Sequence, residues 1–296
     1  MEEKKVSIIL PVYNGADHIE ESINSVLAQT YQNWELIIVN DCSTDDTLQI
    51  CKNISQKDTR IIIISNNINL KLPKSLNVGF ENASGDYYTW TSDDNLYKKN
   101  ALEVMVDFLN SHKDVAMVYA DYTNIDSVGN NISDVKLPES KNIVIGNVCG
   151  ACFLYTSDVA KKVGDYDINL FLAEDYDYWI RISRNGKIIH LDKNLYYYRR
   201  HALSLTETKK SLIKEQTYKA LEKNFLYLYD AAISSGLKYE FLEHVLRRGE
   251  GHIEETQKYL VDVDYLLKVR LVYKCIANKD LKNKLYIFLS KFVRKK

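Results

Sequence analysis

The amino-acid sequence predicts an open, mostly parallel α/β sheet followed by a C-terminal helical region. Three observations support this fold class. Short apolar runs rich in Ile and Val alternate with stretches of helical spacing over the first 120 residues. The chain between successive runs is long enough for the crossover helix that parallel strands require. From Glu207 onward the pattern is helical, with few Gly or Pro residues to interrupt it.

The strands of this sheet are expected at five apolar runs, whose hydrophobicity is typical of strands buried on both faces. They are Val6–Leu10, Glu35–Val39, Arg60–Ile64, Asp86–Trp90 and Val115–Tyr119. The helices between them are expected at residues 19–27, at a segment begun by Thr44 and Asp45, near Leu76–Asn82 and at Asn100–Leu109. This alternation indicates a mostly parallel α/β sheet.

Less regular segments follow the fifth strand. Residues 121–146 carry turn signals and are expected to form loops and short strands outside the sheet core. A short helix is expected at Thr156–Val163, and the acidic stretch Glu174–Asp177 is expected to open a helix over Tyr178–Arg184. A further strand is predicted around Ile188.

The charge balance separates two parts of the chain. With 39 Lys+Arg against 40 Asp+Glu, the formal net charge is -1, so no global field would recruit nucleic acid. Residues 1–206 hold 20 basic and 28 acidic side chains, whereas the remainder holds 19 basic and 12 acidic. This asymmetry predicts an acidic working domain beside a basic tail.

Nothing at the start of the sequence predicts export. The residues before the first strand lack the apolar core of a signal peptide, and no apolar run approaches the roughly 20 residues that span a bilayer. We therefore expect a cytoplasmic protein with reduced cysteines. Cys149 and Cys152 are spaced like a redox or metal pair, but no further ligands of suitable spacing accompany them, so the spacing is interpreted as incidental.

Polar residues follow each of the first four strands, at the edge where parallel α/β sheets bind ligands. These residues are Pro11-Val-Tyr-Asn14, Asn40-Asp-Cys-Ser-Thr-Asp-Asp46, Ser65-Asn-Asn67 and Thr91-Ser-Asp-Asp-Asn95. A dinucleotide enzyme would need a glycine-rich turn after the first strand, and that turn is missing. Carboxylates at strand ends suit a divalent cation instead.

Six motifs along the chain occur in a fixed order. They are VSIILPVYN at 6–14, IIVNDCSTDDT at 37–47, ASGDY at 83–87, WTSDDN at 90–95, EDYDYWIR at 174–181 and YRRHALSL at 198–205. The series resembles the motifs of family-2 glycosyltransferases over about the first two-thirds of the chain. The resemblance implies a GT-A fold, a nucleotide-diphosphate-sugar donor, a divalent metal and inversion at the anomeric carbon.

The implied enzyme is an inverting glycosyltransferase that transfers a sugar from a nucleotide-diphosphate sugar, for which a UDP-sugar is expected. The acceptor is expected to be a hydroxyl of a saccharide or glycolipid in surface polysaccharide or oligosaccharide biosynthesis. We expect its catalytic domain at residues 1–205, with the nucleotide-sugar part over about 1–120 and the acceptor part over about 121–205. Residues 206–296 are expected to form a C-terminal helical extension.

The resemblance places the donor nucleotide at the ends of the first strands. Pro11, Tyr13 and Asn14 are expected to line the base pocket, where a ring and an amide suit a nucleobase. Asp41 can accept a hydrogen bond from the N–H of a uracil.

The loop after the third strand departs from the family pattern, which often has Asn-X-Gly and a nearby Arg. This chain has Asn67-Ile-Asn69 instead. Asn67 remains a candidate for donor binding, and Lys71 or Lys74 is expected to substitute for the Arg. An arginine can donate two parallel hydrogen bonds to a phosphate and a lysine cannot, so the substitution changes how the phosphates are bound.

The metal, Mn²⁺ or Mg²⁺, is expected at the Asp93-Asp94 pair. The family pattern is Asp-X-Asp followed by Asp, and Thr91 occupies its first position, so one ligand is lost. Either Asp93 or Asp94 could bind directly, with phosphate oxygens and waters completing the shell. Asp93 is also expected to contact the donor.

The leaving diphosphate needs positive charge as its bond to the sugar breaks. His201 is expected near the diphosphate and the metal, because the resemblance places a histidine there. Arg199 or Arg200 is expected to supply further charge.

The acceptor hydroxyl must lose a proton during the transfer, which calls for a carboxylate near the donor sugar. Asp175 matches the Asp of the family's Glu-Asp pair and is the predicted general base. Glu174 is expected to orient sugar hydroxyls, and Asp177 is the alternative base if the register of the motif differs. Trp179 is a candidate acceptor platform or a core residue.

The last helix predicted from the sequence is amphipathic and basic over residues 281–296. It is expected either to lie on an anionic membrane surface, at the inner face of the cell membrane, or to pack on protein, including a homodimer partner. A lipid-linked acceptor would suit the first role. The departures at Thr91 and Asn69 also leave a second hypothesis, a catalytically silent protein of the same fold that binds sugar nucleotides or acts as a scaffold.

Overall fold

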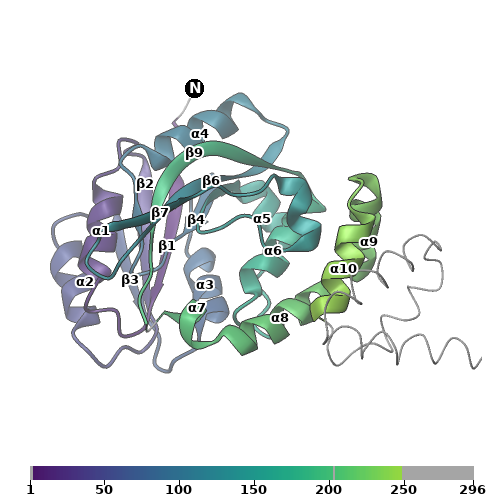
Figure 1. Ribbon diagram of the computed structural model, residues 1–296. Helices are drawn as coiled ribbons and strands as arrows, with labels where there is room; N and C mark the ends of the chain where they lie inside the picture. The colour runs from purple at the N-terminus through teal and green to yellow at the C-terminus, as the bar shows by residue number, and fades with distance from the viewer. Residues whose placement is uncertain (1–2, 203, 249–296) are drawn as a thin grey trace, which may run out of the picture. The chain divides into compact units, whose positions relative to one another are not determined.

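The structure of the protein is a computed structural model, and it describes residues 3–202 and 204–248 (Figure 1). The chain divides into two compact units, residues 1–228 and 229–296, and each is described by itself. The functional boundary expected after residue 205 stays a prediction, and the tail at 281–296 lies outside the described residues. None of the described helices combines the length and the apolar character needed to cross a bilayer.

A mixed sheet forms the centre of the first unit, with the strand order β3-β2-β1-β4-β8-β6-β9-β5 and β7 paired to β6. The strands are β1 (Val6–Val12), β2 (Trp34–Asn40), β3 (Ile61–Ser65), β4 (Tyr87–Trp90), β5 (Leu96–Tyr97), β6 (Val115–Ile125), β7 (Asn131–Val135), β8 (Cys152–Thr156) and β9 (Lys187–Arg199). Strands β1 to β4 pair in parallel. β8 lies antiparallel between β4 and β6, and β9 is parallel to β6. The predicted α/β fold is confirmed, with parallel pairing over β1 to β4 and largely antiparallel pairing in the remainder of the sheet.

Helices cover both faces of the parallel strands (Figure 1). The bounds are α1 (Ile19–Leu27), α2 (Thr47–Ser55), α3 (Leu72–Glu81), α4 (Ala101–Ser111), the 3-10 helix η1 (Ser140–Ile145), α5 (Ser157–Val163), α6 (Glu174–Ser183), α7 (Leu205–Thr208), α8 (Lys210–Lys223), α9 (Phe225–Ser234) and α10 (Lys238–Arg248). Ile8 and Leu10 of β1 join the core that α1, α2 and α4 bury. On the opposite face, α3 approaches so closely that a Cβ on Gly79 would lie 2.3 Å from Ile9 Cγ2.

Two strands are longer than expected. β6 continues to Ile125, through residues predicted to form loops and short strands outside the sheet core. β9 extends through three consecutive tyrosines, Tyr196 to Tyr198, and ends at Arg199. Asp121 looks like a loop residue in the sequence, yet it is buried inside β6. Its carboxylate lies 2.6 Å from His190 Nε2 of β9 and accepts a hydrogen bond from Leu137 N. Partners distant in sequence therefore satisfy a polar side chain inside the sheet.

The helix that carries the acidic motif begins at Glu174, four residues before the expected Tyr178. Glu174, Asp175 and Asp177 all lie in its first turn. Negative side chains there interact favourably with the helix dipole. The acidic motif is thus part of α6 and moves with it as one rigid element.

Candidate active site

The loops that follow β1 and β2 are fastened to each other. Asn14 adopts a left-handed conformation, with φ of 55°. Its side-chain oxygen accepts a hydrogen bond of 2.8 Å from Thr44 N, and its own backbone N–H donates to Ser43 Oγ at 3.0 Å. Gly15 N donates to Thr47 Oγ1 at 2.9 Å. Asn14 therefore ties the two loops together, with its amide oxygen engaged in the fold, and its role in donor binding stays a prediction.

Asp41 organises the loop after β3. The carboxylate is buried and accepts hydrogen bonds from Asn66 Nδ2, Leu70 N and Lys71 N at 2.8 to 2.9 Å. These donors hold the left-handed conformation at Lys71, whose φ is 65°. The structure thereby brings the ends of β2 and β3 together, as the parallel order of these strands requires.

The remaining donor candidates surround these two loops. Pro11 is buried in β1, whereas Tyr13 is half-exposed just beyond its end. Asn67 and Lys74 are exposed. Lys71 directs its ammonium group to the ring of Phe171, at 5.5 Å from the ring centroid. Phe171 precedes α6 by three residues, so Lys71 links the predicted donor loops to the acidic motif.

Asp93 is packed beneath the loop after β1. A Cβ on Gly15 would lie 2.0 Å from Asp93 Oδ2, so only glycine leaves room for the carboxylate there. Burial, together with the neighbouring charge of Asp94, raises the pKa of Asp93 to about 7. Among the described residues no side chain donates a hydrogen bond to this carboxylate.

Asp94 faces His201. Asp94 Oδ2 lies 3.0 Å from His201 Nε2, and its Oδ1 accepts a hydrogen bond of 2.6 Å from Ser92 Oγ. Both side chains are partly exposed. No group of three or more His, Cys, Asp or Glu side chains in the described part of the chain is assembled to hold a metal. The carboxylate of Asp94 beside the imidazole of His201 nevertheless fits part of the shell of a divalent cation.

Arg199 lies in the protein interior rather than in an open phosphate site. Its side chain is 1 % exposed. The guanidinium donates to the backbone oxygens of Asp94 and Ser127 and forms an ion pair with Glu21 of α1. These contacts fix the loop that carries Asp94. Arg199 therefore holds the loop of Asp94 in place in this structure, while Arg200 is exposed and pairs with Glu207.

Asp175 and Glu174 occupy the first turn of α6 with different surroundings. Glu174 is buried, and burial together with the charge of Asp175 raises its pKa well above the usual range of a carboxyl. Asp175 keeps part of its surface exposed to solvent. The protein atoms packed around its carboxyl group nevertheless raise the pKa of this group too. Asp175 Oδ2 accepts a hydrogen bond of 2.6 Å from Asn147 Nδ2. A partly exposed carboxyl with a raised pKa is suited to accept a proton.

Two other residues of the acidic motif belong to the core. Asp177 is fully buried, and its carboxylate contacts Arg181 and Asn224, so it does not serve as an alternative base. Trp179 is also fully buried, with its ring 4.5 Å from that of Phe153. Trp179 is therefore a core residue in this structure, rather than an accessible platform for an acceptor.

Residues that the sequence analysis did not select complete this region. Burial raises the pKa of the Tyr198 phenol, and the charges of both Asp94 and Asp175 add to the shift. Tyr198 therefore lies within electrostatic reach of both carboxylates. His18 approaches His201, with 5.8 Å between ring centroids, and burial, followed by the charges of Arg199 and His201, lowers its pKa.

The signals that could have found these residues were weak. His18 lies in the loop after the first strand, which was a usable signal. Asn147 lies in a segment without a motif, and Tyr198 is one of three consecutive tyrosines, so the sequence alone did not distinguish either of them.

Comparison with known proteins gives a consistent result. The model of glycosyl transferase family 2 matches residues 7–164. A protein of Rickettsia typhi named an uncharacterized glycosyltransferase is 33% identical over 276 residues, which cover 88% of this chain and 85% of that protein. An uncharacterized glycosyltransferase of Haemophilus influenzae is 29% identical over 98% of this chain and 97% of its own length.

Solved structures share the fold. TarS of S. aureus, residues 1–349 in complex with UDP-GlcNAc, has a TM-score of 0.65 at 21% sequence identity and covers 88% of this chain and 76% of its own. A mannosyltransferase of Pyrobaculum calidifontis, in complex with GDP-Man and Mn²⁺, has a TM-score of 0.61 at 13% identity and covers 96% of this chain and 83% of its own. The sheet order, the matched family model and the full-length relatives agree: this chain is a glycosyltransferase with a GT-A fold and belongs to glycosyl transferase family 2.

Proposed function

We propose that this enzyme transfers a sugar, with inversion, from a nucleotide-diphosphate sugar to a hydroxyl of a saccharide or lipid-linked saccharide. A UDP-sugar is the expected donor, and Mn²⁺ or Mg²⁺ is the expected cofactor. The observation that carries the proposal is the contact at the end of β4, where Asp94 Oδ2 lies 3.0 Å from His201 Nε2. A carboxylate paired with an imidazole suits a divalent cation, and the acidic first turn of α6 supplies a separate carboxylate, Asp175, that suits a proton.

The donor nucleotide is proposed to bind over the ends of β1, β2 and β3. Tyr13 offers an exposed ring, and Asp41 offers a buried carboxylate beside it in the sheet. The backbone around Asn14 and Lys71 is held in left-handed conformations by side-chain hydrogen bonds. A pocket fixed in this way loses little conformational entropy when a ligand binds.

The cation would be held by Asp94 and His201, which face each other at 3.0 Å. When bound, it would supply positive charge to the departing diphosphate. Asp93 packs next to this site beneath Gly15, and Arg199 fixes the backbone of Asp94. This assignment selects Asp94 over Asp93 as the direct ligand.

Asp175 is proposed as the general base. The acceptor oxygen forms a bond to the anomeric carbon as the bond from that carbon to the phosphate oxygen breaks. The electron pair of the broken bond leaves with the nucleoside diphosphate, and the proton of the acceptor hydroxyl passes to Asp175. Asn147 orients the carboxylate through its 2.6 Å hydrogen bond, and Glu174 is proposed to orient sugar hydroxyls.

The setting of the reaction follows from the same proposal. A lipid-linked saccharide in surface polysaccharide assembly would bring the enzyme to the inner face of the cell membrane, where residues 281–296 would contact anionic lipid. A homodimer through the same segment is the alternative use of that helix. The complexes of TarS with UDP-GlcNAc and of the mannosyltransferase with GDP-Man and Mn²⁺ support the donor class and the metal.

The test is a donor panel. UDP-, GDP- and TDP-sugars are incubated with the full chain and Mn²⁺, Mg²⁺ or EDTA, and release of the nucleoside diphosphate is measured. We expect turnover with one or more UDP-sugars that depends on the divalent cation. Nucleotide binding without turnover of any donor would favour a catalytically silent binding protein instead. Cation-independent turnover would remove the metal from the proposal.

A further inference from the structure

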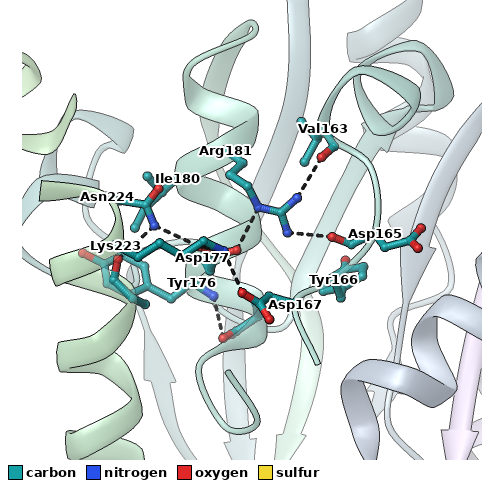
Figure 2. A network of polar contacts seen from close by, with 12 residues as sticks. Val163, Asp165, Tyr166, Asp167, Tyr176, Asp177, Ile180, Arg181, Lys223 and Asn224 are labelled. Carbon is teal, nitrogen blue, oxygen red and sulfur yellow. Dashed lines mark hydrogen bonds and ion pairs between the residues drawn. The ribbon is translucent and has the colours of Figure 1, made fainter. Parts of the chain in front are cut away.

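A network of polar contacts joins α6 to the end of α8 and to the segment that precedes α6 (Figure 2). Its centre is Asp177, which has no exposed side-chain surface. Asp177 Oδ2 accepts a hydrogen bond of 2.8 Å from Arg181 Nε, one helical turn further along. Asp177 Oδ1 accepts a hydrogen bond of 2.9 Å from Asn224 Nδ2, and Lys223 Nζ lies 3.1 Å away.

The same network fixes the chain that leads into α6. Arg181 Nη1 donates to Val163 O at 2.8 Å, and its Nη2 donates to Asp165 O at 2.9 Å. Between these anchors and α6, Asn77 of α3 donates to Tyr166 O and accepts from Tyr166 N, at 2.9 and 2.8 Å. The segment that delivers the acidic motif is therefore held at its backbone from two helices.

The contribution of α8 is specific. Asn224 directly follows α8 and is 2 % exposed, and its side-chain oxygen accepts a separate hydrogen bond of 2.7 Å from Arg184 Nη2. Lys223 pairs with Asp167 as well as with Asp177. A carboxylate without exposed surface is tolerated only when it is paired and hydrogen-bonded, so Asp177 depends on these partners.

We propose that Asn224 and Lys223, acting through Asp177, are positioning residues for Asp175. The inference rests on the proposed function, in which Asp175 is the base. Asp177 and Asp175 lie in the first turn of one rigid helix, so a partner that fixes Asp177 fixes the direction of Asp175. The catalytic unit then includes the end of α8, beyond the boundary at residue 205 that the motifs indicate.

A cavity borders this network, and its lining does not indicate a ligand site. Its volume is about 410 Å³, and Asn77, Tyr166, Arg181 and Lys223 are among its lining residues. The Arg181 and Lys223 side chains are already paired with Asp177, and Asn77 with Tyr166. The polar groups there hold the protein together, so the network is assigned to positioning rather than to a ligand.

A matched pair of substitutions tests the proposal. Asn224→Ala removes the hydrogen bond to Asp177, whereas Arg184→Met removes the hydrogen bond that Asn224 Oδ1 accepts and keeps the bond from Asn224 to Asp177. Because a displacement of about 1 Å at a reacting group can cost up to about 100-fold in rate, we expect Asn224→Ala to lower kcat on the order of 10-fold. The donor KM should stay unchanged, and Arg184→Met should keep the kcat of the wild type.

Two measurements decide the outcome. The first is kcat and KM for the donor that turns over in the panel, and the second is hydrogen exchange of backbone amides at residues 173–177 in the full chain. Faster exchange and lower kcat in Asn224→Ala alone would support positioning. Equal effects in both variants, or unchanged kcat in Asn224→Ala, would overturn it.

Failure of the proposed function would look different. If wild type turns over no donor, or if Asp175→Asn keeps its kcat, Asp175 is not the base. The exchange measurement on Asn224→Ala would still show whether the network holds the first turn of α6, independently of activity.

Discussion

The Asp93-Asp94 pair and the Glu174-Asp175 pair are both adjacent carboxylates, yet their surroundings differ. Burial raises the pKa of Asp93 in the first pair and of both Glu174 and Asp175 in the second. In the first pair, Asp94 faces the imidazole of His201, and Arg199 donates a hydrogen bond to the backbone oxygen of Asp94. In the second pair, the described donors to the carboxylates are neutral, namely the Asn147 amide and backbone N–H groups. The first arrangement suits a bound cation, whereas the second suits a group that gains and loses a proton.

The largest expected effect is that of a substitution at Asp175, the proposed general base. Asp175→Asn should lower kcat on the order of 100-fold or more, because removal of a positioned base costs that much. The affinity for UDP with Mn²⁺ should stay near that of the wild type. Steady-state kinetics and calorimetric titration with UDP measure the two quantities. Asp158→Asn, an exposed carboxylate on α5, is the control, and an equal loss of UDP binding in Asp175→Asn would assign that residue to the donor site.

A second substitution tests the cation site. Asp94→Asn should reduce the gain in UDP affinity caused by Mn²⁺ by about 10-fold or more, because a neutral amide is a poor ligand for a hard cation. Titration with UDP in Mn²⁺ and in EDTA gives that gain directly. Asp46→Asn, an exposed carboxylate before α2, controls for a general loss of negative charge. An undiminished Mn²⁺ effect would shift the direct ligand to Asp93.

The buried member of the second pair predicts a pH-dependent stability. Because burial raises the pKa of Glu174, the folded protein binds more protons than the unfolded chain above the ordinary carboxyl pKa of about 4.3. The stabilisation is fully present below that value and is lost as pH rises through the raised pKa. Glu174→Gln lacks this loss, so it should gain about 1–2 kcal/mol of unfolding free energy over wild type between pH 5 and pH 8.

Urea unfolding at the two pH values measures this difference. Gln can still accept the hydrogen bond that Leu172 N donates to Glu174 Oε2 at 2.6 Å, so the local contact is kept. A difference between variant and wild type that does not change with pH would mean that Glu174 titrates normally.

The smallest expected effect is that of a substitution at Tyr198. Tyr198→Phe removes the hydroxyl that lies 3.0 Å from Thr206 Oγ1 but keeps the ring. We expect kcat/KM to fall about 5-fold, the equivalent of one neutral hydrogen bond of about 1 kcal/mol. Tyr197→Phe is the neighbouring control. An effect as large as that of Asp175→Asn would give the phenol a direct role in proton transfer.

Most of the fold could be predicted because its strands have a local sequence pattern. The runs at β1, β2 and β3 are apolar and flanked by turn residues, and the structure places them where the pattern does. β8 could not be placed, because its position between β4 and β6 depends on pairings between segments far apart in the chain. The extension of β6 through Asp121 escaped prediction because His190, its partner, is remote in sequence.

The site residues divide in the same way. Asp93, Asp94, Asp175 and His201 follow from motifs, and the structure brings Asp94 and His201 into contact. Arg199 and Trp179 occur in the same motifs but point into the protein, and the side of the chain that a residue faces is decided by packing. Asn224 had no signal at all, since an asparagine at the end of a helix is usually only a cap.

By itself, the sequence determined the α/β architecture, the family and the positions of the acidic motifs, because these depend on local periodicity and on motifs of fixed spacing. Only the tertiary structure decided that Asp94 rather than Asp93 faces His201, that Arg199 and Asp177 are structural anchors, and that α8 reaches the helix of the acidic motif. The reason is physical: the pKa and the partners of a carboxylate are set by groups within a few ångströms in space, and most of these groups are distant in the chain.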